Sequence, residues 1–261
     1  MRIAVFSDVH GNPFVCETVL KEIENAGPFD AVVAAGDSLF GGSDPARCAE
    51  LLMASGAQVL YGNTEEYIRA PQLIPPDKRH ARKWDRLQPI AYWIREQLSP
   101  QQLAWVDAMP FEARFSPTNN PQDDLLVVHA NPKDNLLFIY PEPVDQITVF
   151  GEVSQPDDDP DLNAYIEGVT AHTVAFGHLH WSSVRHWNGY TLVNVAACSG
   201  SVYNGLERAR FTVFTWTGDS WALERHAIKY EAQLEAAALR ASTHPDKETW
   251  AKTYDAEDEG V

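Results

Sequence analysis

The alternation of short apolar runs with helical patterns is the feature of this sequence that most narrows its fold. Apolar runs typical of buried strands occur at residues 3–6, 31–35, 58–61, 125–128, 173–176 and 191–197. Helical patterns separate the first three runs: one begins at Asn12-Pro13 and ends at Gly27, and a second lies between Asp44 and Gly56. Strands that alternate with helices indicate βαβ units, so we expect an α/β fold with a mainly parallel sheet.

Two segments interrupt this alternation. Residues 65–111 carry helical patterns and are interpreted as a helical insertion, and residues 131–170 as an irregular insertion. Later, two alternating segments flank Thr217-Gly218-Asp219, which indicates a hairpin over 208–230, and a helix is expected over 231–241. We therefore predict a single domain over residues 1–241, followed by an acidic C-terminal tail over 242–261.

Composition and charge limit the class of protein. Hydrophobic residues make up 44% of the 261 positions, enough for a buried core, and the net charge of −17 argues against a protein that coats nucleic acid. Part of that charge lies at 155–161 and 255–261, interpreted as a solvated loop and a frayed tail, with a calcium loop as the alternative for the first.

The cysteine pattern and hydropathy predict a cytoplasmic protein with no membrane partner. Cys16, Cys48 and Cys198 are far apart and form no C-x-x-C motif, which suits a reducing compartment. No stretch approaches the ~18 apolar residues of a membrane span. The oligomeric state is left open.

Side chains that can bind metal follow five of the apolar runs, at the point where each strand is expected to end. They are Asp8, His10, Asp37, Asn63, His129, His178 and His180. In an open parallel sheet the carboxyl ends of the strands meet at one edge, where ligands bind. We therefore expect these seven side chains to converge.

Mixed imidazole and carboxylate ligands suit divalent ions such as Mn²⁺, Fe²⁺, Co²⁺, Ni²⁺ or Zn²⁺. Seven side chains exceed what one ion with open positions uses, and a carboxylate can bridge two ions about 3.5–4 Å apart. Asp37, at the end of a central strand, is the natural bridge. The sequence thus predicts two divalent metal ions, with Mn²⁺ as the first choice, in a locally positive pocket for a small anionic substrate.

The order D-x-H, G-D, G-N, H and G-H-x-H resembles that of the calcineurin-like metallophosphoesterases, over residues 2–213. The segment 193–214 is similar to a region of the small bacterial and archaeal branch, which includes diadenosine-tetraphosphatase-like proteins and phosphodiesterases. The resemblance implies a four-layer αββα sandwich. It also implies two ion sites that share Asp37. One ion would be held by Asp8, His10, Asp37 and His180, and the other by Asp37, Asn63, His129 and His178.

The resemblance implies attack of a metal-bridging hydroxide on phosphorus, in small phosphodiester or phosphoanhydride substrates of the nucleotide type. Candidate catalytic residues are Asp37, Asn63, Thr64 and His178. Many family members have histidine where Thr64 stands. A hydroxyl donates a hydrogen bond but is no general acid near neutral pH, so we expect good leaving groups to be favoured over simple alkyl monoesters.

Two other functions stay open as alternatives. A non-catalytic metal-binding scaffold of the same fold is compatible with threonine at position 64. A nuclease is disfavoured by the net charge of −17. Residues 36–44 lack the Gly-Asp-x-x-Asp-Arg motif of protein serine/threonine phosphatases, which argues against that activity.

Substrate contacts are expected from the one basic cluster, residues 77–86, and from Asn12. Arg79, Arg82 and Lys83 have spacings that can share a helix face, where they either grip a phosphate or face solvent. Asn12 is either the cap of the first helix or a substrate contact, and one role does not exclude the other.

Overall fold

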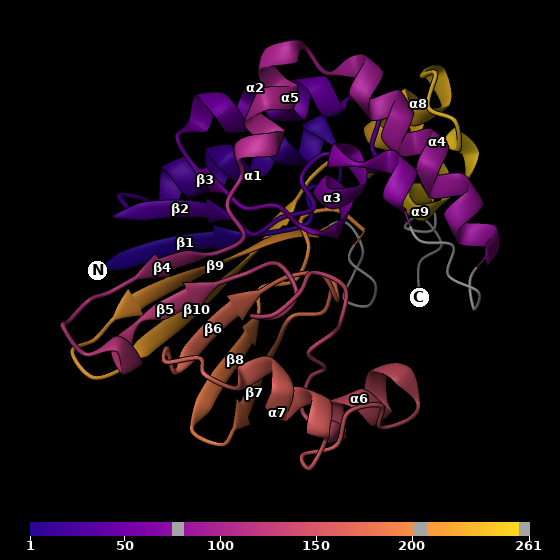
Figure 1. Ribbon diagram of the computed structural model, residues 1–261. Helices are drawn as coiled ribbons and strands as arrows, with labels where there is room; N and C mark the ends of the chain where they lie inside the picture. Colours follow the sequence, from indigo (N-terminus) through magenta and orange to yellow (C-terminus); the bar gives the residue numbers. More distant parts are fainter. Residues whose placement is uncertain (75–80, 201–207, 256–261) are drawn as a thin grey trace.

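The computed structural model describes residues 1–74, 81–200 and 208–255, with the backbone alone over 81–85. The described residues form two five-stranded sheets that pack face to face (Figure 1). The first has the order β10-β9-β1-β2-β3. Its strands are β1 (Arg2–Phe6), β2 (Ala31–Ala34), β3 (Gln58–Val59), β9 (Arg208–Trp216) and β10 (Trp221–Lys229). β1, β2 and β3 are parallel, and the long β9–β10 hairpin adds to β1 in the antiparallel sense.

The second sheet has the order β4-β5-β6-β8-β7. Its strands are β4 (Ala113–Phe115), β5 (Leu125–Val127), β6 (Thr173–Phe176), β7 (Ser183–Trp187) and β8 (Tyr190–Asn194). β5, β6 and β8 are parallel, and antiparallel β4 and β7 form the edges. Side chains of both sheets, among them Val5, Val33, Val127 and Val193, share one buried cluster, so the two sheets bury their inner faces against each other.

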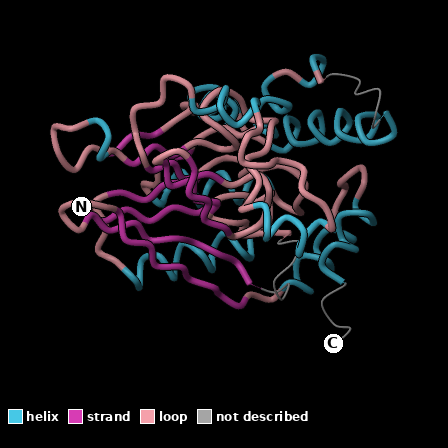
Figure 2. The backbone as a smooth tube through the Cα atoms, turned by 90° about the horizontal axis from the view of Figure 1, so that it is seen from below, coloured by secondary structure: helices cyan, strands magenta, loops and turns pink. Residues whose placement is uncertain are grey.

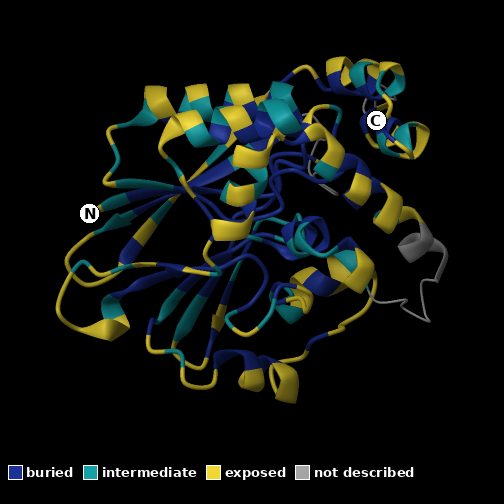
Figure 3. Cartoon of the chain, turned by 45° about the horizontal axis from the view of Figure 1, so that its top comes forward, coloured by how far each residue is buried: buried dark blue, intermediate teal, exposed yellow. Residues whose placement is uncertain are grey.

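Helices cover both outer faces. On the side of the first sheet lie α1 (Pro13–Ala26), α2 (Pro45–Ser55), α3 (Asn63–Arg69), α4 (Ala81–Gln97), α5 (Pro100–Ala108), α8 (Ala232–Ala241) and α9 (Lys247–Asp255). On the side of the second lie α6 (Pro143–Phe150) and α7 (Pro160–Ile166). Most strands except β10 are largely buried, and exposed residues lie on the outer helix faces and in loops (Figure 3). The four-layer αββα sandwich is confirmed.

Local signals explain most of the elements. The Asn12 side chain accepts a hydrogen bond from the Val15 N–H and caps α1, and Asp44 caps α2 in the same way. Most of the described residues within 65–111 are helical, in α3, α4, α5 and a short 3-10 helix at Pro71–Leu73. β4 and β7 were not predicted because both are edge strands that mix polar and apolar residues.

Two expectations need correction. The 131–170 segment is irregular only in part, since it contains α6 and α7, and Asp159 in its acidic stretch caps α7. The acidic tail predicted over 242–261 is wrong for 247–255, which form α9 and bury Ala251 and Tyr254. The prediction of one domain over 1–241 stays a prediction. Among the described residues, no helix is both long and apolar enough to cross a membrane.

Loops gather at the end of the sheets toward which the parallel strands run (Figure 2). The loops that follow β1, β2, β3, β5 and β6 all belong to this edge. They hold the residues that the sequence analysis singled out.

Candidate metal centre

The predicted metal ligands form two neighbouring groups. We call Asp8, His10 and His180 the first group, and Asp37, His129 and His178 the second group. Within each group, one ligand atom per residue lies within 4.8 Å of the others. The loops after β1 and β6 supply the first group, and the loops after β2, β5 and β6 supply the second. Chain segments far apart in sequence therefore deliver both groups to one edge.

The backbone at these ligands is in the left-handed region. The φ angles are 57° at Asp8, 54° at His10, 51° at Asp37, 63° at His178 and 59° at His180. Of the described non-glycine residues, just Asn188 and Ala196 share this property. Such conformations cost on the order of 1–3 kcal/mol each and cluster at functional sites. The strain is concentrated where side chains must be aimed at a common point.

Two motif glycines are explained by close packing at the same place. A Cβ atom on Gly62 would collide with the Asp37 carboxylate, and one on Gly177 would collide with Ser7 and the Asp8 carboxylate. At Gly177 the neighbouring side chains have no room to move aside, because Ser7 and Asp8 are fully buried. Glycine is therefore required before Asn63 and before His178.

Each histidine of the two groups is anchored through one ring nitrogen to a backbone carbonyl. The anchors join His10 Nδ1 to Phe40 O (2.9 Å), His180 Nδ1 to Gly200 O (2.9 Å), His129 Nδ1 to Ala35 O (2.8 Å) and His178 Nε2 to Leu136 O (3.2 Å). A carbonyl only accepts, so the anchored nitrogen carries the hydrogen and donates it. The other nitrogen of a neutral ring then presents its lone pair to the group.

These lone pairs face each other. The Nε2 atoms of His10 and His180 are 3.0 Å apart, and His129 Nε2 lies 3.2 Å from His178 Nδ1. Two nitrogen lone pairs repel at such distances unless a cation or a shared proton lies between them. The donor set and its geometry therefore fit a divalent metal ion in each group.

Asp8 completes the first group. Its carboxylate is fully buried, and Oδ1 has no hydrogen-bond partner although it lies 3.2 Å from His180 Nε2. An unsatisfied buried carboxylate oxygen between two imidazoles fits a cation. Burial lowers the pKa of His180, but the adjacent Asp8 carboxylate outweighs it and raises that pKa to about 9. Burial and the neighbouring His180 lower the pKa of His10.

Asp37 belongs to the second group and also faces the first. Its Oδ1 accepts the Thr64 N–H (3.0 Å) and lies 3.2 Å from His129 Nε2 of the second group. Its Oδ2 lies 4.0 Å from His10 Nε2 of the first group. One carboxylate oxygen thus faces each group, which is the geometry of a bridging ligand.

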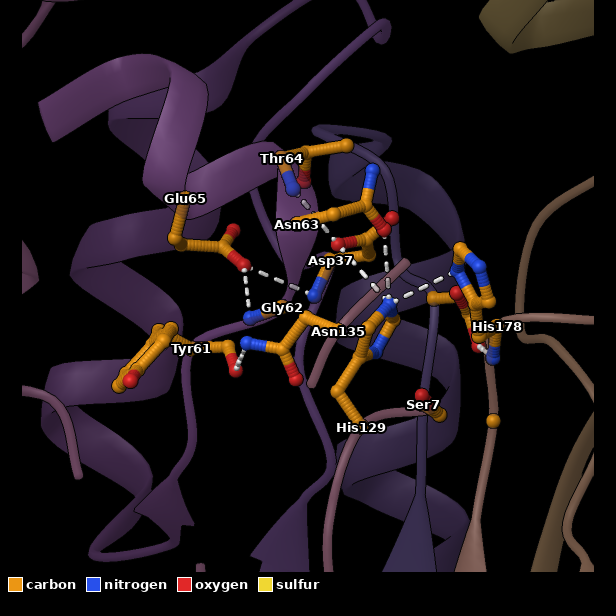
Figure 4. A network of polar contacts seen from close by, with 12 residues as sticks. Ser7, Asp37, Tyr61, Gly62, Asn63, Thr64, Glu65, His129, Asn135 and His178 are labelled. Atoms are coloured by element: carbon orange, nitrogen blue, oxygen red, sulfur yellow. Dashed lines mark hydrogen bonds and ion pairs between the residues drawn. The ribbon is translucent and has the colours of Figure 1, made fainter. Parts of the chain in front are cut away.

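Asn63 joins the second group, with its Oδ1 3.1 Å from His129 Nε2 (Figure 4). Burial opposes a proton on His129, but the Asp37 carboxylate outweighs it and raises the pKa of His129. Burial and the neighbouring His129 lower the pKa of His178 to about 4. In each group, then, one imidazole holds a proton more tightly than usual and the other less tightly.

Glu65 is a positioning residue to which the sequence analysis gave no role. Its buried carboxylate accepts the N–H groups of Asp37 (2.9 Å), Ser38 (2.9 Å), Leu39 (3.2 Å) and Gly62 (2.9 Å). It therefore ties the loop after β2 to the start of α3 (Figure 4). Burial and the nearby Asp37 carboxylate raise the pKa of Glu65 to about 7. The available signal was a glutamate three residues after the Gly62 cap, as in a capping box.

The C-terminal helix α9 also reaches the site. The Trp250 ring lies 6.3 Å from the His10 ring and 6.4 Å from the Phe40 ring, between ring centres. The Tyr254 hydroxyl lies 2.7 Å from Ser199 Oγ, and the Ser199 N–H donates to the Asp8 carbonyl (3.0 Å). The segment expected to be a tail therefore packs behind the first group.

The remaining predicted residues differ in outcome. Thr64 is buried, and its Oγ1 has no hydrogen-bond partner. Asn12 caps α1 as expected but is fully buried, which leaves no surface for a substrate contact. Arg79 lies outside the described residues, and Arg82 and Lys83 lie in the first turn of α4, where only the backbone is described. Their contact with phosphate stays a prediction.

The fold and the two ligand groups together define a metallophosphoesterase type of site. The sequence profile of the calcineurin-like phosphoesterases matches residues 1–219, and the chain belongs to that family. The comparison with curated proteins finds no match.

Solved structures share the fold at low identity. A metallophosphoesterase from Sphaerobacter thermophilus is 20% identical with a TM-score of 0.67, and the alignment covers 98% of this chain and 100% of that one. A hypothetical protein from Pyrococcus horikoshii OT3 is 14% identical with a TM-score of 0.71, covering 98% and 97% of the two chains. At these identities the likeness concerns the fold alone.

Proposed function

We propose that this protein is a metal-dependent phosphoesterase that uses two divalent ions to hydrolyse small phosphodiester or phosphoanhydride substrates of the nucleotide type. The observation that carries the proposal is the position of Asp37. One of its oxygens lies beside His129 of its own group, and the other faces His10 of the first group. Family membership supports the general class of hydrolase.

The first ion would be held by Asp8, His10, His180 and Asp37, and the second by Asp37, Asn63, His129 and His178. Ions bound there would supply an attacking nucleophile at neutral pH and would neutralise charge on the phosphoryl oxygens. Mn²⁺ is our first choice, because its hard–borderline character suits two carboxylates and an amide oxygen beside four imidazoles; Fe, Zn, Co and Ni suit the same donors.

The protein's own residues contribute through the positions in which they hold the metal-binding atoms. Backbone carbonyls hold a hydrogen of each imidazole on the outer nitrogen, so no ring has to turn for its inner nitrogen to bind a metal. Thr64 replaces the histidine of many family members, and its buried hydroxyl is free to donate a hydrogen bond but not to protonate a leaving group. We infer a preference for anhydrides or activated diesters, whose leaving groups need no proton.

A non-catalytic scaffold is the competing interpretation. Five strained ligand backbones and an unsatisfied buried carboxylate oxygen cost stability and have no purpose in a pure scaffold. They support an active centre. The three described cysteines are free and buried, which agrees with our proposal of a cytoplasmic enzyme.

The test is to purify the protein without chelator, count metals by mass spectrometry and assay it with Mn²⁺ on bis-p-nitrophenyl phosphate, p-nitrophenyl phosphate and diadenosine tetraphosphate. We expect two metals per chain and turnover of a diester or anhydride that Asp37→Asn abolishes. Asp107→Asn, on an exposed position of α5, is the matched control. Metal without turnover of any substrate would favour the scaffold, and no metal under any loading condition would overturn the site itself.

A further inference from the structure

We propose that an apolar rim beside the second group binds an aromatic or branched apolar ester group of the substrate; this inference rests on the proposed phosphoesterase function. The rim is defined here as Leu73, Leu136, Leu137 and Phe138. Their exposed fractions are 72%, 43%, 50% and 36%. Single exposed apolar residues are ordinary, but three in succession next to a candidate active site indicate a binding surface.

The loop that carries the rim is held in place by hydrogen bonds. Asp134 Oδ1 accepts the N–H groups of Leu136 (2.7 Å) and Leu137 (2.8 Å). Asn131 Nδ2 donates to the Leu137 carbonyl (2.9 Å), and Asn135 Nδ2 donates to Glu66 Oε1 of α3 (2.9 Å). The apolar side chains are therefore presented at fixed positions, which lowers the entropy that a ligand must overcome.

The rim touches the second group directly. His178 donates from Nε2 to the Leu136 carbonyl (3.2 Å), and the Phe138 ring stacks on the His178 ring with centres 4.5 Å apart at 20°. On the other wall, Tyr67 follows Asn63 by about one turn of α3. A group bound against the rim would thus be next to a phosphoryl group at the second metal position.

A cavity opens between these two walls. It has a volume of about 300 Å³ and is lined by Tyr67, Ala70, Leu73, Ile74 and Leu136, together with Glu66 and Arg69. This volume is at the lower end of the ~300–1,000 Å³ range of small-molecule sites, so it suits one ring rather than a large ligand.

The two charged lining residues are already engaged. Arg69 donates to the carbonyls of Val106 (2.7 and 3.1 Å) and Met109 (3.0 Å), and Glu66 accepts from Asn135. The guanidinium is therefore not offered to a phosphate, and the Glu66 carboxylate repels one. The phosphoryl group belongs at the metal ligands, and the cavity takes the neutral, apolar part of the same molecule.

The experiment compares two phosphonates by titration calorimetry with the Mn²⁺-loaded protein. Phenylphosphonate and methylphosphonate carry the same charged head and differ in the apolar group. We expect phenylphosphonate to bind about tenfold more tightly or better, from burial of the ring. In the double variant Leu73→Ala/Leu136→Ala the ratio should fall close to one. Leu234→Ala, a half-exposed leucine on α8, is the matched control and should keep the wild-type ratio.

The outcomes separate this inference from the proposed function. Equal binding of both phosphonates by the wild type, or a ratio that the double variant leaves unchanged, would overturn the rim and leave the phosphoesterase proposal intact. Binding of neither phosphonate would overturn the phosphoryl site and the rim with it. Because both leucines are substantially exposed, the double variant should fold, and circular dichroism checks this. Equal affinities of the wild type for the two phosphonates would overturn the rim even without the double variant.

Discussion

The two ligand groups have the same composition, one carboxylate and two imidazoles, but they are supported by different parts of the molecule. The first group is backed by α9, at the far end of the chain, through Trp250 and Tyr254. The second is backed by α3 and the loop over 131–138, through Glu65 and Phe138. The first group is therefore supported by a helix near the C-terminus, and the second by two segments that lie between its own ligands in the sequence.

The difference indicates separate tasks. Asp8 of the first group is fully buried. The second group borders Thr64 and the apolar rim, so we propose that the substrate is selected on its side. Asp37 faces both groups through its two carboxylate oxygens. Variants that affect one group more than the other test this division of tasks.

The largest effect is expected from Asp37→Asn compared with Asp8→Asn. Asn at position 37 keeps an oxygen for the Thr64 N–H but loses the charge shared by both groups, so both metals should be lost. Asp8→Asn should empty the first group only. Metal counts near zero and one per chain, from mass spectrometry, would show this. Without the metals the transition state loses several kcal/mol of stabilisation. We therefore expect Asp37→Asn to lower kcat by about a thousandfold or more. Equal metal counts in the two variants would contradict a bridging Asp37.

Trp250→Ala should weaken the first group alone. The indole packs against His10 and against Phe40, whose carbonyl anchors the His10 ring. Loss of such outer support typically costs about 10- to 100-fold in metal affinity. Mn²⁺ titration should therefore resolve one weakened and one unchanged site.

Trp187→Ala is the control for Trp250→Ala. Trp187 is a buried tryptophan of β7 in the core of the second sheet, away from both groups. Trp187→Ala should lower the free energy of unfolding by about 3–5 kcal/mol, and Trp250→Ala by less because its ring is only partly buried. Only Trp250→Ala should change Mn²⁺ affinity, and a parallel loss in Trp187→Ala would reduce the effect to general destabilisation.

The same difference between the groups explains what could be predicted from sequence. Both sets of ligands follow strand runs, so their convergence was predictable from the parallel topology. The support of the second group was partly visible, because Gly62 and Glu65 form a local capping pattern. The support of the first group was not visible, since a nine-residue helix with as many acidic as basic side chains has no local signal for packing on His10. Long-range contacts of this kind depend on three-dimensional packing rather than on local periodicity.

Proton release should also distinguish the groups. Asp8 raises the pKa of His180 to about 9 in the metal-free protein, so His180 is protonated at pH 7 and must lose that proton to bind a metal. The apparent affinity of the first group should rise about tenfold per pH unit up to about pH 9. Calorimetry in buffers of different ionisation enthalpy would count the released proton.

A rise in pH has the opposite effect on the metal-free protein: it lowers the stability of the fold. A folded-state pKa of about 9 for His180, above its ordinary value of 6.5, stabilises the fold fully below about pH 6.5. That stabilisation is lost as the pH rises through 9. Urea unfolding in the presence of chelator should show lower stability at pH 9 than at pH 6.5, and Asp8→Asn should reduce this dependence; an unchanged dependence would exclude the Asp8–His180 pair as its source.

The smallest effect on metal binding is expected from Glu65→Gln. Glutamine keeps one side-chain oxygen that accepts from backbone N–H groups, but its NH2 group is a donor and cannot accept from the remaining ones. We therefore expect the free energy of unfolding to fall by about 1–3 kcal/mol. Asp37 would remain but be less well held, so Mn²⁺ affinity should fall by about tenfold or less. Glu235→Gln is the matched control, because Glu235 is also buried, has a pKa raised to about 7 by burial, and accepts hydrogen bonds from Ser43. If both variants are destabilised to a similar extent and only Glu65→Gln loses Mn²⁺ affinity, Glu65 positions the bridging ligand Asp37. Unchanged Mn²⁺ affinity in Glu65→Gln would limit the role of Glu65 to stability.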